Sequence, residues 1–296
     1  MSETLVGLIG GTGIGEALMQ GTKGRRKTVS TPFGKPSGPV LLGEVGGQKV
    51  AVLARHGEGH RFNPSAVPYR ANLYALKKLG VTHILASGAT GSLQETIAPR
   101  HLVIVDQVID KTLRPGRTFF DDLAVHVEFA QPFCPGLRSL LIECGMGLET
   151  TVHPKGTYVC MEGPQFSTRA ESLQHRSWGA DLIGMTLMPE ARLAREAEIC
   201  YALIAVPTDY DCWRPHEAGI SADEVLESIL ANVQAGTANA VELMKRAVPK
   251  IAEAVGPECG CRSALAKAVW TDRKAISPAA RRRLEPLVGK YLATGR

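Results

Sequence analysis

Long hydrophobic runs and aromatic residues are scarce in this 296-residue sequence. Phe, Trp and Tyr make up 5% of it, and no apolar stretch approaches the ~18 uncharged residues that a membrane-spanning helix needs. The first residues, Met1–Thr4, lack the basic region and the cleavage site of a signal peptide. The sequence therefore predicts a protein without a membrane partner, and we expect it to reside in the cytoplasm.

A strong charge of one sign is also missing. The formal net charge is +5, and residues 262–296 carry nine Lys and Arg against two Asp and Glu, so the remaining chain sums to −2. A nearly neutral body offers no platform for nucleic acid. The basic C-terminal stretch is interpreted as the solvated face of an amphipathic helix, and a phosphate pocket elsewhere needs only one or two local cations.

Metal-binding patterns are absent as well. The seven cysteines show no zinc spacing, and Cys259-Gly260-Cys261 is tighter than the usual zinc knuckle. A strained small-ring disulfide is an alternative for that pair, although free thiols are the default in a reducing cytosol. His56 and His60 flank Glu58, but the H-E-x-x-H pattern needs a helix, and two intervening glycines disfavour one. We expect no metal.

The sequence does contain a regular alternation of short apolar runs and helical stretches. This alternation, with 44% hydrophobic residues, is typical of an α/β layered fold around a central sheet. Strands are predicted at Val6–Ile9, Val50–Ala54, Thr82–Ala86, Leu102–Val108, Thr157–Met161, Asp181–Met185 and Ile199–Val206, and helices at Tyr69–Leu79, Pro135–Met146, Thr168–Trp178, Pro189–Glu198, Asp223–Arg246 and Ser277–Leu292. We expect one domain over residues 1–256 and a C-terminal helical extension, 257–296, packed on it.

Two acidic residues, Asp209 and Asp211, follow the predicted strand Ile199–Val206. Alternate residues of an extended chain share a face, and ligands of open α/β sheets bind beyond the carboxyl ends of the strands. The two carboxylates therefore suit a heterocycle rich in N–H donors, such as adenine, and their proximity should leave one of them protonated at neutral pH by separating their pKa values. The alternative is a turn in which the Asp side chains accept nearby backbone N–H groups.

Small residues follow the carboxyl ends of several predicted strands. The glycine-rich segment Gly10–Gly15 favours the binding of an anion, although a tight turn after the strand explains these glycines equally well. The spacing of the glycines fits the dinucleotide-binding pattern poorly. Arg55-His56 offers a planar donor fork and an imidazole to an oxyanion. Ser87–Leu93 and Gly184–Thr186 are expected to be loops that add backbone donors and a hydroxyl, and neither carries the G-x-S-x-G elbow of a serine hydrolase.

Several longer motifs together carry a resemblance. Gly10–Gly13, Thr31–Ser37, Leu53–Gly57 and Glu162–Glu171 resemble the trimeric purine nucleoside phosphorylase family. Within that family, Thr208–Trp213 is most similar to the branch that acts on 5′-methylthioadenosine. The resemblance spans roughly residues 6–246, and motifs of this length do not coincide by chance.

The resemblance implies a single α/β domain with a mixed, partly barrel-like sheet, assembled as a homotrimer. It implies phosphorolysis of a nucleoside, with inorganic phosphate as co-substrate and no metal or organic cofactor. It also implies which residues bind. Phosphate would contact Thr12, Arg55, His56, Gly88, Ala89 and Thr186, and the ribose would contact Met185. The purine would contact Phe166, Ser167, Asp209 and Asp211. The 5′ substituent would contact Ala222 and Val225 of the same chain and His126 of a neighbouring subunit.

The acidic residues fit this reaction on chemical grounds. A protonated Asp209 could donate to N7 of the departing purine as a general acid. A carboxylate also accepts a hydrogen bond from a 6-amino group, whereas a 6-oxo purine would favour Asn, so Asp209 favours adenine. Asp209 and Asp211 are therefore the predicted catalytic residues.

Some positions depart from the family pattern, among them Gly88 and Ala222. Gly88 replaces a Thr or Ser and removes a hydroxyl contact to phosphate, and Ala222 is smaller than the Val of some relatives, which widens the 5′ pocket. Three alternatives follow. They are a broader phosphorylase that accepts adenosine or methylthioinosine, a nucleosidase that uses water, and a nucleoside-binding protein with a weakened phosphate site.

Overall fold

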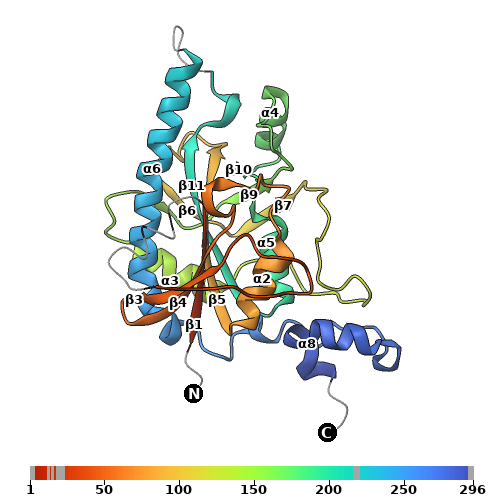
Figure 1. The fold of residues 1–296 in the computed structure, drawn as a ribbon. Coiled ribbons are helices and arrows are strands. Elements are labelled where there is room, and N and C mark those ends of the chain that lie inside the picture. Colours follow the sequence, from red (N-terminus) through yellow and green to blue (C-terminus); the bar gives the residue numbers. More distant parts are fainter. Residues whose placement is uncertain (1–3, 12–13, 15–16, 18–23, 216–220, 293–296) are drawn as a thin grey trace.

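The computed structural model describes residues 4–11, 14, 17, 24–215 and 221–292. It is a mixed α/β fold in which one sheet is flanked by helices on both sides (Figure 1). The sheet contains both parallel and antiparallel pairs, for example β1 (Leu5–Gly10) with β4 (Gln48–Ala54) and β11 (Cys200–Asp209) with β6 (Leu102–Ile104). The predicted fold class is therefore confirmed.

The sheet branches at its longest strand, β5 (Val81–Ser92). Its main path runs β2-β3-β4-β1-β5-β10-β9-β7, while β11 pairs with β5 and β6, and β8 pairs with β6. The other strands are β2 (Arg25–Lys27), β3 (Val40–Val45), β7 (Gln107–Asp110), β8 (Val152–His153), β9 (Thr157–Cys160) and β10 (Leu182–Gly184).

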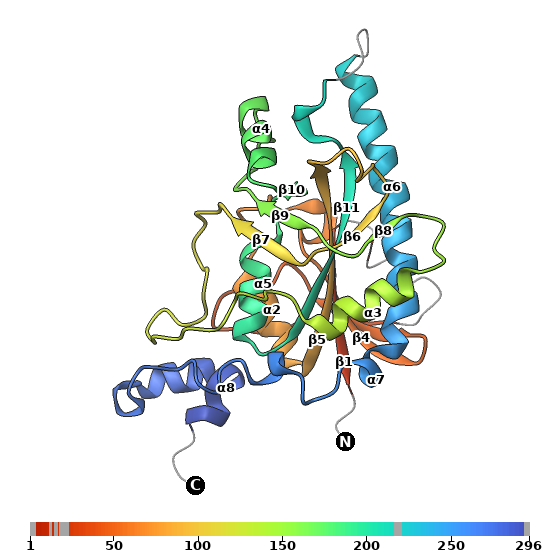
Figure 2. The same cartoon turned by 180° about the vertical axis from the view of Figure 1, so that it is seen from behind.

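Helices cover the two faces of the sheet, as Figures 1 and 2 show from opposite sides. On one face lie α3 (Pro135–Gly145), α6 (Ala222–Ala247) and the short α7 (Ile251–Ala254). On the other lie α2 (Tyr69–Lys78) and α5 (Leu187–Glu196), with α8 (Pro278–Leu292) beside α2. The other helices in the described part of the chain are α4 (Arg169–Ser177) and the short turns η1 (Glu58–His60), η2 (Asp211–Trp213), η3 (Val248–Lys250), η4 (Gly260–Ser263) and η5 (Arg273–Ala275).

The central strands are apolar on both faces because each face is covered. In β5, Leu85 packs in the cluster beneath α3 and α6, whereas its neighbours Ile84 and Ala86 pack in the cluster beneath α2 and α5. In β11, Leu203 and Ile204 divide in the same way. Alternate side chains of a strand point to opposite faces, so a doubly covered strand reads as a continuous apolar run. This explains why these strands were predictable.

The Ser87–Leu93 segment differs from the prediction. It was expected to be a loop, but β5 continues through it to Ser92. Pairing with β1 ends at Ala86, pairing with β10 begins at Gly91, and β11 pairs along the other side. Among the described strands, none pairs with Ser87–Thr90 on the side between β1 and β10. The predicted strand Leu102–Val108 is likewise two strands, β6 and β7, and β2, β3 and β8 were not predicted.

The C-terminal extension contacts the body through α8. Leu284, Leu287 and Val288 lie in the same core cluster as Leu73 of α2, and the Tyr74 hydroxyl donates to the Arg283 carbonyl over 3.1 Å. The boundary at residue 256 stays a prediction. Within the described parts of the chain, no helix is long and apolar enough to cross a membrane.

Candidate active site

A cavity of about 520 Å³ opens where β5, β10 and β11 end near α6. This volume falls in the range of small-molecule sites. Ten of the predicted site residues line it: Arg55, His56, Gly88, Ala89, Phe166, Ser167, Met185, Thr186, Asp209 and Asp211. The structure thus brings the basic and the acidic motifs, about 150 residues apart in sequence, to one cavity.

Arg55 is held at the end of β4 by a buried network. Its Nε and Nη2 donate to the two carboxylate oxygens of Glu190 over 2.7 and 2.8 Å, and its Nη1 donates to the Ser87 carbonyl over 2.8 Å. Tyr201 donates its hydroxyl to Glu190 over 2.8 Å. Both charged side chains of the pair are 1% exposed. The guanidinium is therefore fixed in one orientation at the wall of the cavity.

The charges of this network stabilise each other. Burial alone would lower the pKa of Arg55, but the paired Glu190 carboxylate outweighs burial and raises it above its ordinary value. Burial, followed by the Glu190 charge, raises the pKa of Tyr201 well above its ordinary value. Arg55 is therefore cationic and Tyr201 neutral, and Glu190 offsets the arginine charge before any anion binds.

His56 lies beside Arg55 with one ring nitrogen occupied. Its Nδ1 is 2.8 Å from the Phe62 carbonyl oxygen. Because a carbonyl only accepts, Nδ1 carries the proton, and Nε2 of the neutral ring is an acceptor. Burial is the main cause that lowers the pKa of His56 to about 4. His56 is therefore neutral at pH 7 and stacks on His60, with ring centroids 4.2 Å apart.

The open edge of β5 lies next to this basic corner. Ser87, Gly88, Ala89 and Thr90 all line the cavity. A Cβ on Gly88 would lie 3.5 Å from Thr186 Oγ1 and 3.8 Å from Arg55 Nη1, so these groups surround one point. Backbone groups without a strand partner, a hydroxyl and a guanidinium are the donors that an oxyanion prefers.

The acidic end of the cavity is built by a turn. Tyr210 (φ −95°, ψ 25°) and Asp211 (φ 48°) depart from extended geometry, so the alternation argument for Asp209 and Asp211 was wrong, although both side chains line the cavity. Asp209 Oδ2 accepts the Asp211 N–H over 2.9 Å, and Oδ1 accepts the Thr208 hydroxyl over 3.0 Å. The turn of the alternative prediction is therefore present, and in it the Asp209 side chain accepts a nearby backbone N–H.

One carboxylate oxygen of Asp211 accepts no hydrogen bond within the described part of the chain. Its Oδ2 is buried and has no hydrogen-bond partner among the described residues. An unpaired buried carboxylate oxygen is costly, and this one belongs to a side chain that lines the cavity. It is suited to an N–H donor of a bound molecule.

Apolar side chains line the space between the two ends. Met185 follows β10, and Phe166 has 83% of its surface exposed at the rim. Helix α6 adds Leu230, Val233 and Thr237, whose spacing places them on one helical face. A flat ring and a sugar can be sandwiched between such walls.

The outcome differs for the other four predicted residues. Thr12 is outside the described residues, as is the side chain of Ala222, the first residue of α6. Val225 lines a second cavity of about 490 Å³, which shares Asp209 and Asp211 with the first. His126 lines neither of these two cavities; its ring packs on Trp270 with centroids 4.6 Å apart. Their roles at the 5′ end stay predictions.

Comparison with known proteins identifies the family. Residues 5–249 match the phosphorylase superfamily. The chain belongs to this superfamily. It is 45% identical to S-methyl-5′-thioadenosine phosphorylase of Geobacter sulfurreducens, over 98% of this chain and 100% of that protein. It is 46% identical to the Pyrococcus furiosus enzyme of the same name, over 88% of this chain and 97% of that protein.

Solved structures agree with this assignment. A methylthioadenosine phosphorylase from an antarctic soil metagenomic library superposes with a TM-score of 0.88 at 46% identity, covering 97% of this chain and 99% of that one. The methylthioadenosine phosphorylase of Schistosoma mansoni in complex with adenine superposes with a TM-score of 0.82 at 36% identity, covering 90% of this chain and 99% of that one. Both are similar over nearly their whole length.

Sequence reasoning missed two parts of this phosphorylase site. Glu190 was assigned to a helix without a role, yet a Glu among the largely apolar residues 187–194 indicates a need for a buried partner; the structure shows that this partner is Arg55. The face of α6 with Leu230, Val233 and Thr237 gave no signal, because apolar residues at helical spacing indicate a core face as readily as a ligand wall.

Proposed function

We propose that this phosphorylase cleaves 5′-methylthioadenosine with inorganic phosphate and releases adenine and 5-methylthioribose 1-phosphate. The observation that carries the proposal is the single cavity in which Arg55, Gly88 and Thr186 lie at one end and Asp209 and Asp211 at the other. The names of the relatives at 45% and 46% identity support the substrate.

The reaction breaks the C1′–N9 bond while phosphate attacks C1′. Positive charge develops on the sugar in the transition state, and the bound phosphate, an anion below the ring, stabilises it. The protein needs to fix phosphate rather than deprotonate it, so oriented donors suffice. Arg55, the open edge of β5 and the Thr186 hydroxyl are proposed to hold phosphate, and Met185 to contact the ribose.

The departing adenine takes electrons from the broken bond and needs a proton or hydrogen bond at N7. Asp209 in its protonated form is proposed to donate there. The unpartnered Oδ2 of Asp211 is proposed to accept from the exocyclic amino group. Phe166 and Ser167 would border the ring. This arrangement favours a 6-amino over a 6-oxo purine.

The finer assignments on assembly and surroundings are also proposals. A homotrimer would let His126, which lines neither cavity of its own chain, reach the 5′ substituent in a neighbouring site. Phosphate is proposed as co-substrate, without a metal or organic cofactor at this site. Cytoplasmic location is proposed from the sequence.

The decisive experiment measures adenine release from methylthioadenosine with and without phosphate. Turnover should require phosphate and yield one sugar phosphate per adenine. Phosphate-independent release would identify a nucleosidase, and intact nucleoside binding without turnover a binding protein. The ratio of kcat/KM for methylthioadenosine to that for adenosine tests the 5′ preference.

The base assignment needs a variant. Asp209→Asn removes the proton donor and provides an amide that suits a 6-oxo group. It should lower kcat for adenine release by about 10²-fold or more, the range of a general acid, and shift preference toward methylthioinosine. Undiminished adenine turnover would rule out Asp209 as the acid.

A further inference from the structure

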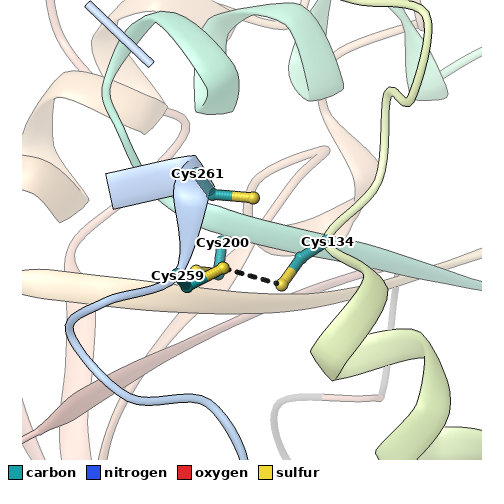
Figure 3. Close-up of side chains that lie close together, drawn as sticks. All are labelled: Cys134, Cys200, Cys259 and Cys261. Atoms are coloured by element: carbon teal, nitrogen blue, oxygen red, sulfur yellow. Dashed lines mark hydrogen bonds between the residues drawn. The ribbon is translucent and has the colours of Figure 1, made fainter. Parts of the chain in front are cut away.

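Four cysteine sulfur atoms lie close together near the start of β11, at the opposite end of this strand from Asp209. The Sγ atoms of Cys134, Cys200, Cys259 and Cys261 all lie within 4.8 Å of one another, and they point toward a common centre in Figure 3. Cys134 and Cys259 are the pair joined by the dashed line, at 3.7 Å. All seven cysteines of the chain are free thiols.

Three separate segments bring these sulfurs together. Cys134 caps the start of α3, Cys200 begins β11, and Cys259 and Cys261 lie at the start of η4. Backbone hydrogen bonds fix them: Cys134 N–H donates to the Tyr201 carbonyl over 2.9 Å, and Arg262 N–H to the Cys259 carbonyl over 2.8 Å. The positions of the four cysteines are thus fixed by the helices, the strand and the backbone hydrogen bonds at which they lie.

The geometry is close to that of a tetrahedral thiolate site. Zn–S bonds of about 2.3 Å place tetrahedral sulfurs about 3.8 Å apart, and the sulfurs of this cluster need only small shifts to reach that spacing. Cys134, Cys200 and Cys261 are buried, while Cys259 is half-buried. Four thiolates around a divalent ion carry a net charge of −2.

We propose that Cys134, Cys200, Cys259 and Cys261 bind one zinc ion that fastens the C-terminal extension to the body. Thiolates select soft ions, and a tetrahedral set of four sulfurs fits zinc. Cys200 and Asp209 stand at opposite ends of β11, about 30 Å apart at ~3.3 Å per residue. The centre is therefore structural and separate from the proposed active site, and it does not depend on the proposed function.

The test begins with untagged protein, purified with a reductant, exposed to zinc and then dialysed. Elemental analysis should find one zinc per chain in the unmodified protein. Cys259→Ser, at the least buried ligand, should lose it, whereas Cys144→Ser, a cysteine outside the cluster, should keep it. Cobalt in place of zinc should give the intense visible absorption of a tetrahedral thiolate site, which needs no variant.

A stability readout separates ligation from a folding defect. A chelator should lower the Tm of the unmodified protein and of Cys144→Ser by several degrees, because binding to the folded state stabilises it. The Tm of Cys259→Ser, folded by circular dichroism, should not respond. Protein that retains no zinc and lacks the cobalt spectrum overturns the proposal, as does a disulfide among the four cysteines in protein kept under reductant.

Discussion

Among single residues, the proposed phosphate end of the cavity contains a buried charge pair. Arg55 and Glu190 are each 1% exposed, and Tyr201 donates to the same carboxylate. Such a pair stabilises little relative to an apolar core, but breaking it leaves an uncompensated buried charge. Glu190 is therefore a positioning residue: it neutralises the buried charge of Arg55 and holds the guanidinium in one orientation at the cavity wall.

Removing this partner should be strongly destabilising. Glu190→Gln keeps the shape and loses the charge, so we expect the free energy of unfolding to fall by about 3–5 kcal/mol in urea denaturation at pH 7. Added phosphate should recover part of the loss, since it supplies the missing negative charge.

The matched control is Glu196→Gln on the same helix. Burial raises the pKa of Glu196 to about 7, so this carboxyl is already partly protonated at pH 7 and its replacement should cost far less. Equal losses for the two variants would contradict the role given to Glu190.

His56 predicts how phosphate binding depends on pH. Its pKa is lowered to about 4, mainly by burial, so at pH 8 the ring is neutral and its Nε2 can only accept a hydrogen bond. The phosphate dianion still carries one hydroxyl, which can donate to Nε2. Because the complex then holds the same number of protons as the free partners, phosphate affinity should change little between pH 8 and pH 9.

Calorimetry in two buffers of different ionisation enthalpy measures proton uptake directly. We expect close to zero protons per phosphate at pH 8. Uptake of about one proton by the unmodified protein, lost in His56→Gln, would show that His56 binds phosphate as the imidazolium and would contradict this prediction.

At the scale of elements, the strands β5 and β11 show what the sequence could predict. Their apolar runs were recognisable because both faces are buried. The continuation of β5 through Ser87–Ser92 was not, because Ser, Gly and Ala are poor strand formers and pairing with β11 decides the conformation. The bend at Tyr210 was not predicted, yet both carboxylates of the acidic motif line the cavity, because the turn presents them to it.

The glycines of β5 should differ sharply in what they tolerate. At Gly88 a Cβ meets only ordinary contacts, 3.5 Å to Thr186 Oγ1 and 3.8 Å to Arg55 Nη1. Gly88→Ser should therefore fold and add a hydroxyl to the phosphate site. One hydrogen bond of about 1 kcal/mol corresponds to a roughly fivefold lower KM for phosphate, while Gly88→Ala should stay near the original value.

Gly91 on the same strand provides the contrast. Its Cβ would lie 3.1 Å from Asp211 Cβ and from Ile183 Cγ2, so Gly91→Ala should displace the acidic turn and raise KM for the nucleoside more than KM for phosphate. Steady-state kinetics with each substrate varied separates the two effects. If Gly88→Ser leaves the KM for phosphate unchanged, phosphate does not bind next to Gly88.

At the scale of the whole molecule, the isolated chain leaves large apolar side chains exposed. Leu113 is 86% and Trp270 71% exposed, and Trp270 packs on His126. We expect a homotrimer to cover part of this exposed apolar surface. It would also bring His126 to the site of a neighbour, and sedimentation analysis should find three chains per particle.

Mixed assemblies decide whether a site draws on two chains. His126→Ala and Asp211→Asn should each raise KM for methylthioadenosine. In a trimer built from one variant alone, every site carries the substitution. When the two variants are produced together, about a quarter of the sites combine an intact Asp211 with an intact His126 from the next chain, by the geometry of a closed ring. Those sites should regain the original KM and appear as a second, tighter kinetic phase. If His126 acted within its own chain, every mixed site would carry one lesion, and no such phase would appear.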